Sequence, residues 1–368
     1  MNTDVLIIGA GCGGLDTAIQ LRQQARDLVI TLVNPTPYLI YRPWLIYLPA
    51  QRRSFEALQV SLQNAAVRLI TNTVIRLDLA QHQAWLGTGE PISYRYLVLA
   101  TGAPADRARL AGAAEHALFP CDVDDALALQ QRFLALKEGN VTVILNGERP
   151  GPSLEYAGWL ATAVHERGLT DRLQIYAVDD QDCLQTLLGS QALELFGRFF
   201  AQKGARLITG QAIRAVHADR IELENEIAWP TTLTAVVGPL HGVDVGLVAP
   251  VIDAQRFVHV HTTFQSVEDP DLFAVGDATR LPAGDELPKS WVITRKQAET
   301  VARHLLAHMS GQDLRPLDIA RIHKGPLTMS MPDVGGQTVV VKNRRVLARG
   351  RWPLLRAFVD RRYLKAHT

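Results

Sequence analysis

Four glycines near the start of the chain have the spacing needed to hold a phosphate group. Gly9, Gly11 and Gly14 form a G-x-G-x-x-G pattern, with Gly13 as a further glycine, directly after the apolar run 5–8 and before a helical pattern. In this setting the first glycine forms the tight turn and the second lets the backbone approach a pyrophosphate. The third lets the helix and the strand pack closely. The pattern therefore predicts a dinucleotide site at the N-terminus of the helix.

The strand expected over residues 28–33 ends at Asn34. Dinucleotide-binding domains usually have an acidic residue at this place, where it binds a ribose hydroxyl. Asn34 has no charge but can form the same hydrogen bond. We therefore include Asn34 among the predicted cofactor-binding residues.

Two later segments repeat the scheme of a buried strand followed by glycine and a polar residue. One strand, 96–99, leads into Ala100, Thr101 and Gly102, and the other, 271–275, leads into Gly276 and Asp277. Together with the first glycine loop, these segments resemble the FAD-dependent pyridine nucleotide-disulfide oxidoreductase superfamily. The resemblance implies that FAD is the cofactor and that Asp277 lies at its ribityl–phosphate region.

The same resemblance implies an α/β fold of the glutathione-reductase-like flavoprotein type. It has two Rossmann-like dinucleotide-binding domains and a small C-terminal region. The expected division is an FAD-binding domain at 1–107 plus 243–318, an inserted NAD(P)H-binding-like domain at 108–242, and a C-terminal region at 319–368.

The inserted domain contains a second strand–helix–strand pattern. The strand 141–145, the helix 154–165 and the strand 173–178 lead to Asp179 and Asp180. An acid at this position favours NADH over NADPH, because a 2′-phosphate would meet a like charge.

The glycine loop of this second unit, 146–153, departs from G-x-G-x-x-G. Pro150 and Pro152 remove two backbone donors, Glu148 would repel a pyrophosphate, and Arg149 supplies a compensating charge. Two alternatives therefore remain open. The domain binds NAD(P)H, or it keeps a nucleotide-binding fold that no longer binds a nucleotide.

Several segments resemble one branch of the superfamily, the type II NADH dehydrogenases and the sulfide:quinone oxidoreductases. Residues 37–43 resemble the segment of that branch beside the isoalloxazine, which implies that Arg42 and Pro43 contact the cofactor. The run from Glu155 to Gly158 resembles a helix start whose glutamate approaches the flavin and the nicotinamide. Pro288-Lys289-Ser290 resembles the P-K-T segment of the sulfide enzymes. We expect Lys289 to stabilise negative charge near the reduced flavin or a bound quinone.

The three cysteines, Cys12, Cys121 and Cys183, lack the C-x2-C and C-x4-C spacings of dithiol reductases and of metal sites. Cys121 lies where the sulfide enzymes have one cysteine, but Arg149 occupies the approximate position of a second. No cysteine follows residue 183. Cys12 is expected to be a small packing residue.

The predicted function is an FAD-dependent oxidoreductase that passes two electrons from NAD(P)H to a quinone or another small acceptor. The candidate catalytic residues are Glu155, Lys289 and Cys121, and no metal site is expected. Two alternatives remain: a sulfide:quinone oxidoreductase-like enzyme with degenerate cysteines, or a repurposed flavoprotein that does not use NAD(P)H.

Composition and charge limit the partners. Of the 368 residues, 38 are Lys or Arg and 37 are Asp or Glu, so no overall field recruits nucleic acid. The few cysteines fit a reducing compartment, no apolar run approaches the roughly 18 residues of a membrane span, and a strand begins by Val5. These features predict a cytoplasmic protein, with a homodimer as one possible assembly.

The end of the chain is basic. From Lys342 to Thr368 it has nine Lys or Arg residues and one acid, Asp360. Apolar side chains recur at helical spacing at Trp352, Leu355, Val359 and Tyr363. Either this helix lies on an anionic membrane, at the inner face of the cell membrane, or it packs its apolar stripe on the body of the protein.

Overall fold

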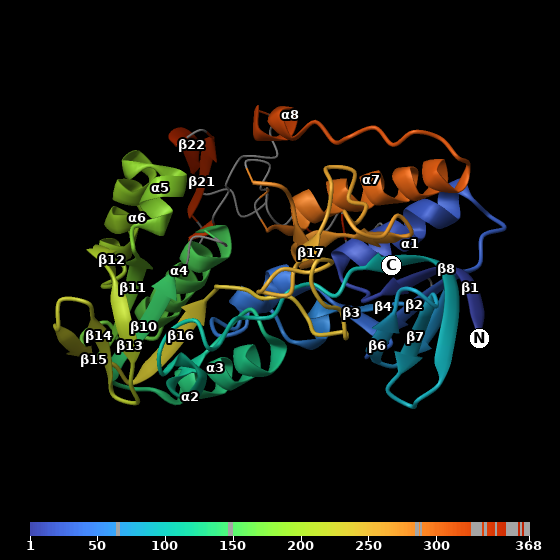
Figure 1. Cartoon of the computed structure of the whole chain (residues 1–368). Helices are drawn as coiled ribbons and strands as arrows, with labels where there is room; N and C mark the ends of the chain where they lie inside the picture. Colours follow the sequence, from blue (N-terminus) through green and yellow to red (C-terminus); the bar gives the residue numbers. More distant parts are fainter. Residues whose placement is uncertain are drawn as a thin grey trace.

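The computed structural model describes residues 1–63, 67–145, 150–283, 287, 289–324, 333–334, 337–342, 344–350, 360 and 363. Within them two sheets lie side by side, each with helices packed against it (Figure 1). One contiguous apolar core contains residues of both sheets, Leu97 and Val143 among them.

The first sheet has seven strands in the order β5-β2-β1-β8-β7-β6, and β18 pairs with β8. Strands β5, β2, β1, β8 and β18 are parallel, whereas β7 and β6 are antiparallel additions. The bounds are β1 Asn2–Ile8, β2 Ile30–Asn34, β5 Arg68–Thr71, β6 Val74–Asp78, β7 Gln83–Leu86, β8 Pro91–Leu99 and β18 Leu272–Ala274. The three apolar strands that precede the glycine motifs, β1, β8 and β18, are therefore neighbours.

The second sheet is parallel, in the order β12-β11-β10-β16-β9. Its strands are β9 Ala117–Leu118, β10 Gly139–Leu145, β11 Leu173–Asp180, β12 Arg206–Gln211 and β16 Leu233–Val237. The helices of this unit are α2 Ala113–His116, α3 Val123–Ala135, α4 Pro150–Glu166, α5 Cys183–Leu188 and α6 Ser190–Gln202. These two sheets with their helices confirm the predicted α/β fold of two Rossmann-like units.

Smaller elements complete the chain. The antiparallel pairs and small sheets are β3 Tyr38–Ile40 with β4 Gln59–Ser61, β13 Ile213–Val216 with β14 Arg220–Leu223 and β15 Ala228–Pro230, and β20 Asp333–Val334 with β21 Gln337–Lys342 and β22 Arg345–Gly350. A parallel pair joins β17 Val258–His259 and β19 Thr279–Arg280. The remaining helices are α1 Cys12–Gln24, α7 Trp291–Met309, α8 Ile319–Lys324, and the 3-10 turns η1 Arg42–Tyr47, η2 Glu56–Leu58 and η3 Gly276–Ala278.

Helices α1 and α7 pack against each other beside the first sheet (Figure 1). The seam between the two units is formed by η1, which contacts both α3 and α4. There the Gln130 side-chain amide donates to the Leu48 carbonyl at 2.7 Å. The segment at η1 of the first unit thus packs on α3 and α4 of the second and is hydrogen-bonded to α3.

Most of the predicted C-terminal helix, residues 351–359, lies outside the described residues. Two of its residues are described, and both lie in the interior: Asp360 is 1% exposed and Tyr363 is fully buried. For Tyr363 this favours packing on the body over a membrane-facing side. Among the described residues, none of the helices combines the length and the apolar character that crossing a bilayer requires.

The first test of the fold concerns Gly14. An added Cβ there would overlap the carbonyl oxygen of Gly9, so α1 could not keep its distance from β1. We expect Gly14→Ala to lower the free energy of unfolding by about 2–3 kcal/mol in urea denaturation. Gly197→Ala is the matched control, because its Cβ would meet no atom within 4 Å in the middle of α6. That variant should gain about 0.5–1 kcal/mol. Equal stability of the two variants would contradict the close packing.

Candidate functional site

The glycine loop joins β1 to α1 and has one open position between crowded ones. Gly9 has φ +96°, and its Cβ would lie 2.5 Å from the Ala100 carbonyl oxygen. At Gly11, which is the N-cap of α1, an added Cβ would meet no atom within 4 Å. The first turn of α1 has no acidic residue. The loop therefore presents backbone N–H groups and free space at the same point, as a bound phosphate requires.

Asn34 fastens this loop from the end of β2. Its side-chain oxygen accepts a hydrogen bond from the Ala10 N–H at 2.9 Å, and its side-chain nitrogen donates to the Thr36 carbonyl at 2.8 Å. The side chain predicted to bind a ribose thus already has a structural function. Contact of Asn34 with a cofactor stays a prediction.

The Ala100–Gly102 segment lies beside the glycine loop. The Ala100 N–H donates to the Ile8 carbonyl at 2.9 Å, and Gly102 has φ +71°, which glycine adopts without strain. A Cβ on Gly14 would lie 3.0 Å from the Ala100 Cβ. The first two predicted cofactor segments are therefore in direct contact.

The third segment, from near the other end of the sequence, lies against the first two. We call the site formed by Gly9–Gly14, Ala100–Gly102 and Gly276–Asp277 the cradle. A Cβ on Gly13 would lie 3.1 Å from the Val275 side chain and 3.0 Å from that of Thr294. The Gly276 N–H donates to the Gln297 side chain at 2.7 Å. The structure thus brings together the residues around Gly9–Gly14 and Gly276, which lie more than 250 positions apart in the sequence.

Cys12 lies between these segments. Burial raises the pKa of its thiol to about 12, the Tyr363 hydroxyl lowers it in part, and the Asp16 and Asp277 carboxylates raise it further. The thiol is therefore protonated at neutral pH and is a poor nucleophile. This agrees with the packing function expected for Cys12.

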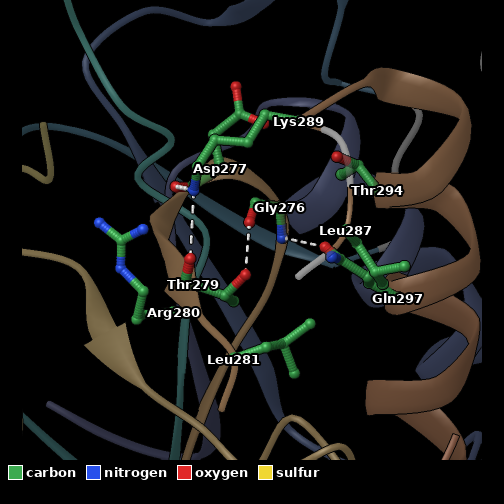
Figure 2. Close-up of a pocket in the computed structure, with 9 residues that line it drawn as sticks. All are labelled: Gly276, Asp277, Thr279, Arg280, Leu281, Leu287, Lys289, Thr294 and Gln297. Atoms are coloured by element: carbon green, nitrogen blue, oxygen red, sulfur yellow. Dashed lines mark hydrogen bonds between the residues drawn. The ribbon is translucent and has the colours of Figure 1, made fainter. Parts of the chain in front are cut away.

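A pocket lies between η3 and the start of α7 (Figure 2). Nine residues line it: Gly276, Asp277, Thr279, Arg280, Leu281, Leu287, Lys289, Thr294 and Gln297. The Lys289 ammonium donates to the Asp277 carbonyl at 2.7 Å and to the Thr279 carbonyl at 3.1 Å. It also lies 4.1 Å from the centroid of the Phe257 ring. Lys289 thus holds the turn that presents Asp277, and its expected action on a flavin or quinone stays a prediction. Pro288 lies outside the described residues.

The other candidate residues meet at the seam between the two units. The Arg42 guanidinium donates to the Cys121 carbonyl at 3.3 Å and lies 3.8 Å from the Asp122 carboxylate. Burial raises the pKa of the Tyr156 phenol above its ordinary value, and the neighbouring Cys121 raises it further. Arg42 is therefore in contact with the main chain at Cys121, and Tyr156 lies near enough to Cys121 for that residue to affect its pKa. Pro43 is the second residue of η1 at the same seam.

Glu155 precedes Tyr156 on α4 and is 1% exposed, so it is an interior residue and not a solvated one on the helix surface. Its approach to a flavin and a nicotinamide stays a prediction.

The acids at the end of β11 bind backbone amides. Asp179 is fully buried and accepts from Leu184 N at 2.9 Å and from Gln185 N at 3.3 Å, whereas Asp180 accepts from Ile213 N at 3.1 Å. Burial raises the pKa of both carboxyl groups. These acids therefore shape the second unit, and the preference for NADH stays a prediction. The preceding loop, 146–149, lies outside the described residues.

Several residues around the cradle left no signal in the sequence. Thr294 lies on α7 outside any of the motifs, and Phe257 comes from an irregular segment. The helical spacing around Tyr363 left open whether its side chain meets a membrane or the body of the protein. A metal site is not formed by the described residues, which contain no suitable group of three or more His, Cys, Asp or Glu side chains.

Known proteins similar to this chain include two quinone reductases. The chain is 26% identical to the sulfide-quinone reductase of Aquifex aeolicus (strain VF5) over 334 residues, which are 83% of this chain and 76% of that protein. It is 23% identical to the mitochondrial sulfide:quinone oxidoreductase of Mus musculus over 303 residues, which are 76% of this chain and 66% of that protein.

Solved structures share the fold. The sulfide:quinone oxidoreductase structure from Aquifex aeolicus matches with a TM-score of 0.84 at 23% identity, covering 98% of this chain and 90% of that one. The structure of NDH2 from Plasmodium falciparum in complex with NADH matches with a TM-score of 0.73 at 14% identity, covering 100% and 95%.

The family model described as pyridine nucleotide-disulphide oxidoreductase matches residues 3–298, which contain both sheets and all three glycine motifs. The chain therefore belongs to the pyridine nucleotide-disulphide oxidoreductase family.

Proposed function

We propose that this protein is an FAD-dependent oxidoreductase that transfers two electrons from NAD(P)H to a quinone. The observation that carries the proposal is the glycine loop in which Gly11 is open, while Gly9 and Gly14 are crowded by protein. The open space lies beside the backbone N–H groups at the start of α1, where a bound pyrophosphate would lie. The reaction balances as NAD(P)H, a proton and a quinone giving NAD(P)⁺ and a quinol.

The residues present fit FAD. The backbone at Gly11 and the N-terminus of α1 would hold the pyrophosphate, and Asp277, held by Lys289, would bind the ribityl–phosphate region. Arg42 and Pro43 would lie at the isoalloxazine. When bound, FAD supplies the hydride and electron chemistry, and the protein supplies binding and orientation.

The second unit supports a nicotinamide nucleotide as the donor. Strands β10 and β11 and helix α4 repeat the parallel strand–helix–strand arrangement of the first unit. We propose that the donor binds at the carboxyl ends of these strands, as in other open parallel sheets. The buried Glu155 on α4 would position the nicotinamide or move a proton.

The quinone acceptor is proposed from the relatives, two of which are quinone reductases by name. An acceptor of this kind is consistent with a cytoplasmic protein that works at the inner face of the cell membrane. The basic residues of β22, including the exposed Arg345, are the described part of the chain that would meet anionic lipid.

An anaerobic titration tests the donor. We expect the purified protein to have the visible absorption of a flavin, NADH or NADPH to bleach it, and a short-chain quinone to restore it. Sulfide is the comparison donor. Bleaching by sulfide and by neither nucleotide would contradict NAD(P)H as the donor. A colourless protein that stays colourless after reconstitution with FAD would contradict the whole proposal.

A second prediction concerns Gly11. Its φ of −66° suits any residue, and a Cβ there meets no protein atom, so Gly11→Ala should leave the stability of the FAD-free protein within about 0.5 kcal/mol. The methyl group would occupy the space proposed for the pyrophosphate. We expect the Kd for FAD to rise at least about tenfold, equivalent to about 1.4 kcal/mol. Flavin fluorescence on dilution measures the change, with Gly197→Ala as the control. An unchanged Kd would place the cofactor elsewhere.

A second candidate, oxidation of sulfide, is favoured by the contacts of Cys121 at the seam and by the names of the relatives. With one thiol at the seam, Cys121 and a hydrosulfide would form a persulfide with the loss of two electrons and a proton, which FAD would accept when bound and pass to the quinone. A second hydrosulfide would then take the outer sulfur away as HSS⁻ and restore the Cys121 thiol.

The test is Cys121→Ser. If sulfide is the donor, sulfide-dependent quinone reduction should fall at least about 100-fold, because the hydroxyl is a far weaker nucleophile than a thiolate. The control is Cys183→Ser, on α5 of the second unit, which should keep the wild-type rate. Unchanged turnover in Cys121→Ser would remove this candidate.

A further inference from the structure

Asp360 is buried in the first unit, although it lies close to the end of the chain. One carboxylate oxygen accepts a hydrogen bond from the Tyr41 hydroxyl at 2.8 Å, and the other accepts from the Trp44 indole N–H at 2.8 Å. Asp360 is 1% exposed, Tyr41 is fully buried and Trp44 is 7% exposed. Both carboxylate oxygens of Asp360 thus accept a hydrogen bond, one from Trp44 of η1 and the other from Tyr41, the residue before η1.

Tyr363 is held by a cluster of aromatic rings from distant parts of the sequence. Its ring stacks on Tyr41, with centroids 5.4 Å apart and planes at 25°. It also makes an edge contact with Trp291 at 5.4 Å, and the Arg295 guanidinium lies 5.2 Å from its centroid. Trp291 and Arg295 belong to the first two turns of α7. Tyr363 is fully buried, and its ring lies between Tyr41, the residue before η1, and Trp291 at the start of α7.

The same cluster reaches the first turns of α1. Arg295, which covers the Tyr363 ring, also lies 3.4 Å from the Asp16 carboxylate, and the Asp16 side chain is 8% exposed. The Tyr363 hydroxyl lies close enough to the Cys12 thiol for the two groups to change each other's pKa. Cys12 directly follows the open Gly11. Tyr363 is thus packed between three elements that surround the cradle.

We propose that Asp360 and Tyr363 are positioning residues for the cofactor: they hold α1, η1 and the start of α7 in the arrangement that binds FAD. This inference rests on the proposed FAD site. Neither residue is assigned a contact with FAD. Their effect passes through Tyr41, which precedes Arg42, and through the first turns of α1 and α7.

Thermodynamic reciprocity follows from this arrangement. If docking of Tyr363 raises the affinity for FAD, then bound FAD must stabilise the docked Tyr363 by the same factor. Couplings between binding events in proteins are typically about 5–150-fold. The same coupling can therefore be measured in two ways: as a change in FAD affinity and as a change in the docking of the end of the chain.

The first experiment measures FAD affinity in the full chain by the flavin fluorescence released on dilution. We expect Tyr363→Ala to raise the Kd for FAD about tenfold and to shift the absorption spectrum of the flavin that remains bound. Tyr363→Phe keeps the ring contacts and should stay within about threefold of wild type. Asp360→Asn, which weakens the bonds to Tyr41 and Trp44, should raise the Kd about fivefold. Leu347→Ala on β22, where the side chain is 56% exposed, is the control and should match wild type.

The second experiment follows tryptic cleavage of the wild-type protein at Arg361 and Arg362, which the sequence places between the two docked residues. Added FAD should slow this cleavage about tenfold, and free adenine should not. This readout needs no variant, so it decides the matter even if Tyr363→Ala fails to fold.

The outcomes separate this inference from the proposed function. A wild-type protein that binds FAD, together with a folded Tyr363→Ala variant of unchanged affinity, overturns the positioning role alone. Cleavage that is indifferent to FAD in the loaded protein does the same. A wild-type protein that never binds FAD overturns the proposed function and this inference with it.

Discussion

The close approach of β1, α1 and the Ala100–Gly102 turn is the constraint on which the rest of this structure depends. Gly14 has no room for a side chain because the Gly9 carbonyl lies against it, and Gly9 has none because the Ala100 carbonyl does. Gly11, between them, has free space. This contrast separates two glycines that the packing of the fold requires from one that it does not. The other cofactor segments are arranged around that open position, since β8 and β18 are neighbours in the same sheet.

The sequence could predict the strands and glycine turns, because local sterics and the burial of apolar runs determine them. The apolar runs before the three glycine motifs predicted buried strands, and these strands lie side by side as β1, β8 and β18. Their pairing is parallel, so the residues that follow each strand gather at one edge of the sheet. Two related strand–helix–strand patterns likewise predicted two units. In each case the signal is local: a short run of residues determines the strand, turn or helix that it forms.

The parts that could not be predicted depend on contacts between distant residues or on a choice between equivalent partners. Asn34 and Asp179 have the residue types expected of ribose ligands, yet both bind backbone amides. Residue type alone does not distinguish a hydroxyl of a cofactor from an N–H of the protein, because both are donors. Helical spacing around Tyr363 likewise does not say whether the apolar side meets a membrane or the protein itself. Only the stacking on Tyr41, 322 positions away in sequence, decides this for Tyr363.

The two units differ in how closely they follow the dinucleotide-binding pattern. The cradle of the first unit has the open glycine, the crowded glycines and an aspartate in a turn held by Lys289, with Asn34 where such domains usually have an acid. In the second unit the terminal acids of β11 serve the fold, and Cys121 is the one cysteine at the seam. Under the proposed function the electron donor binds against the second unit, so a change of donor would leave the cradle untouched. Tyr363, near the end of the chain, packs on Trp291 at the start of α7, and Arg295 beside it lies 3.4 Å from Asp16 of α1. Donor specificity is therefore the property that the cradle does not determine, and the experiments on NAD(P)H and sulfide address the second unit.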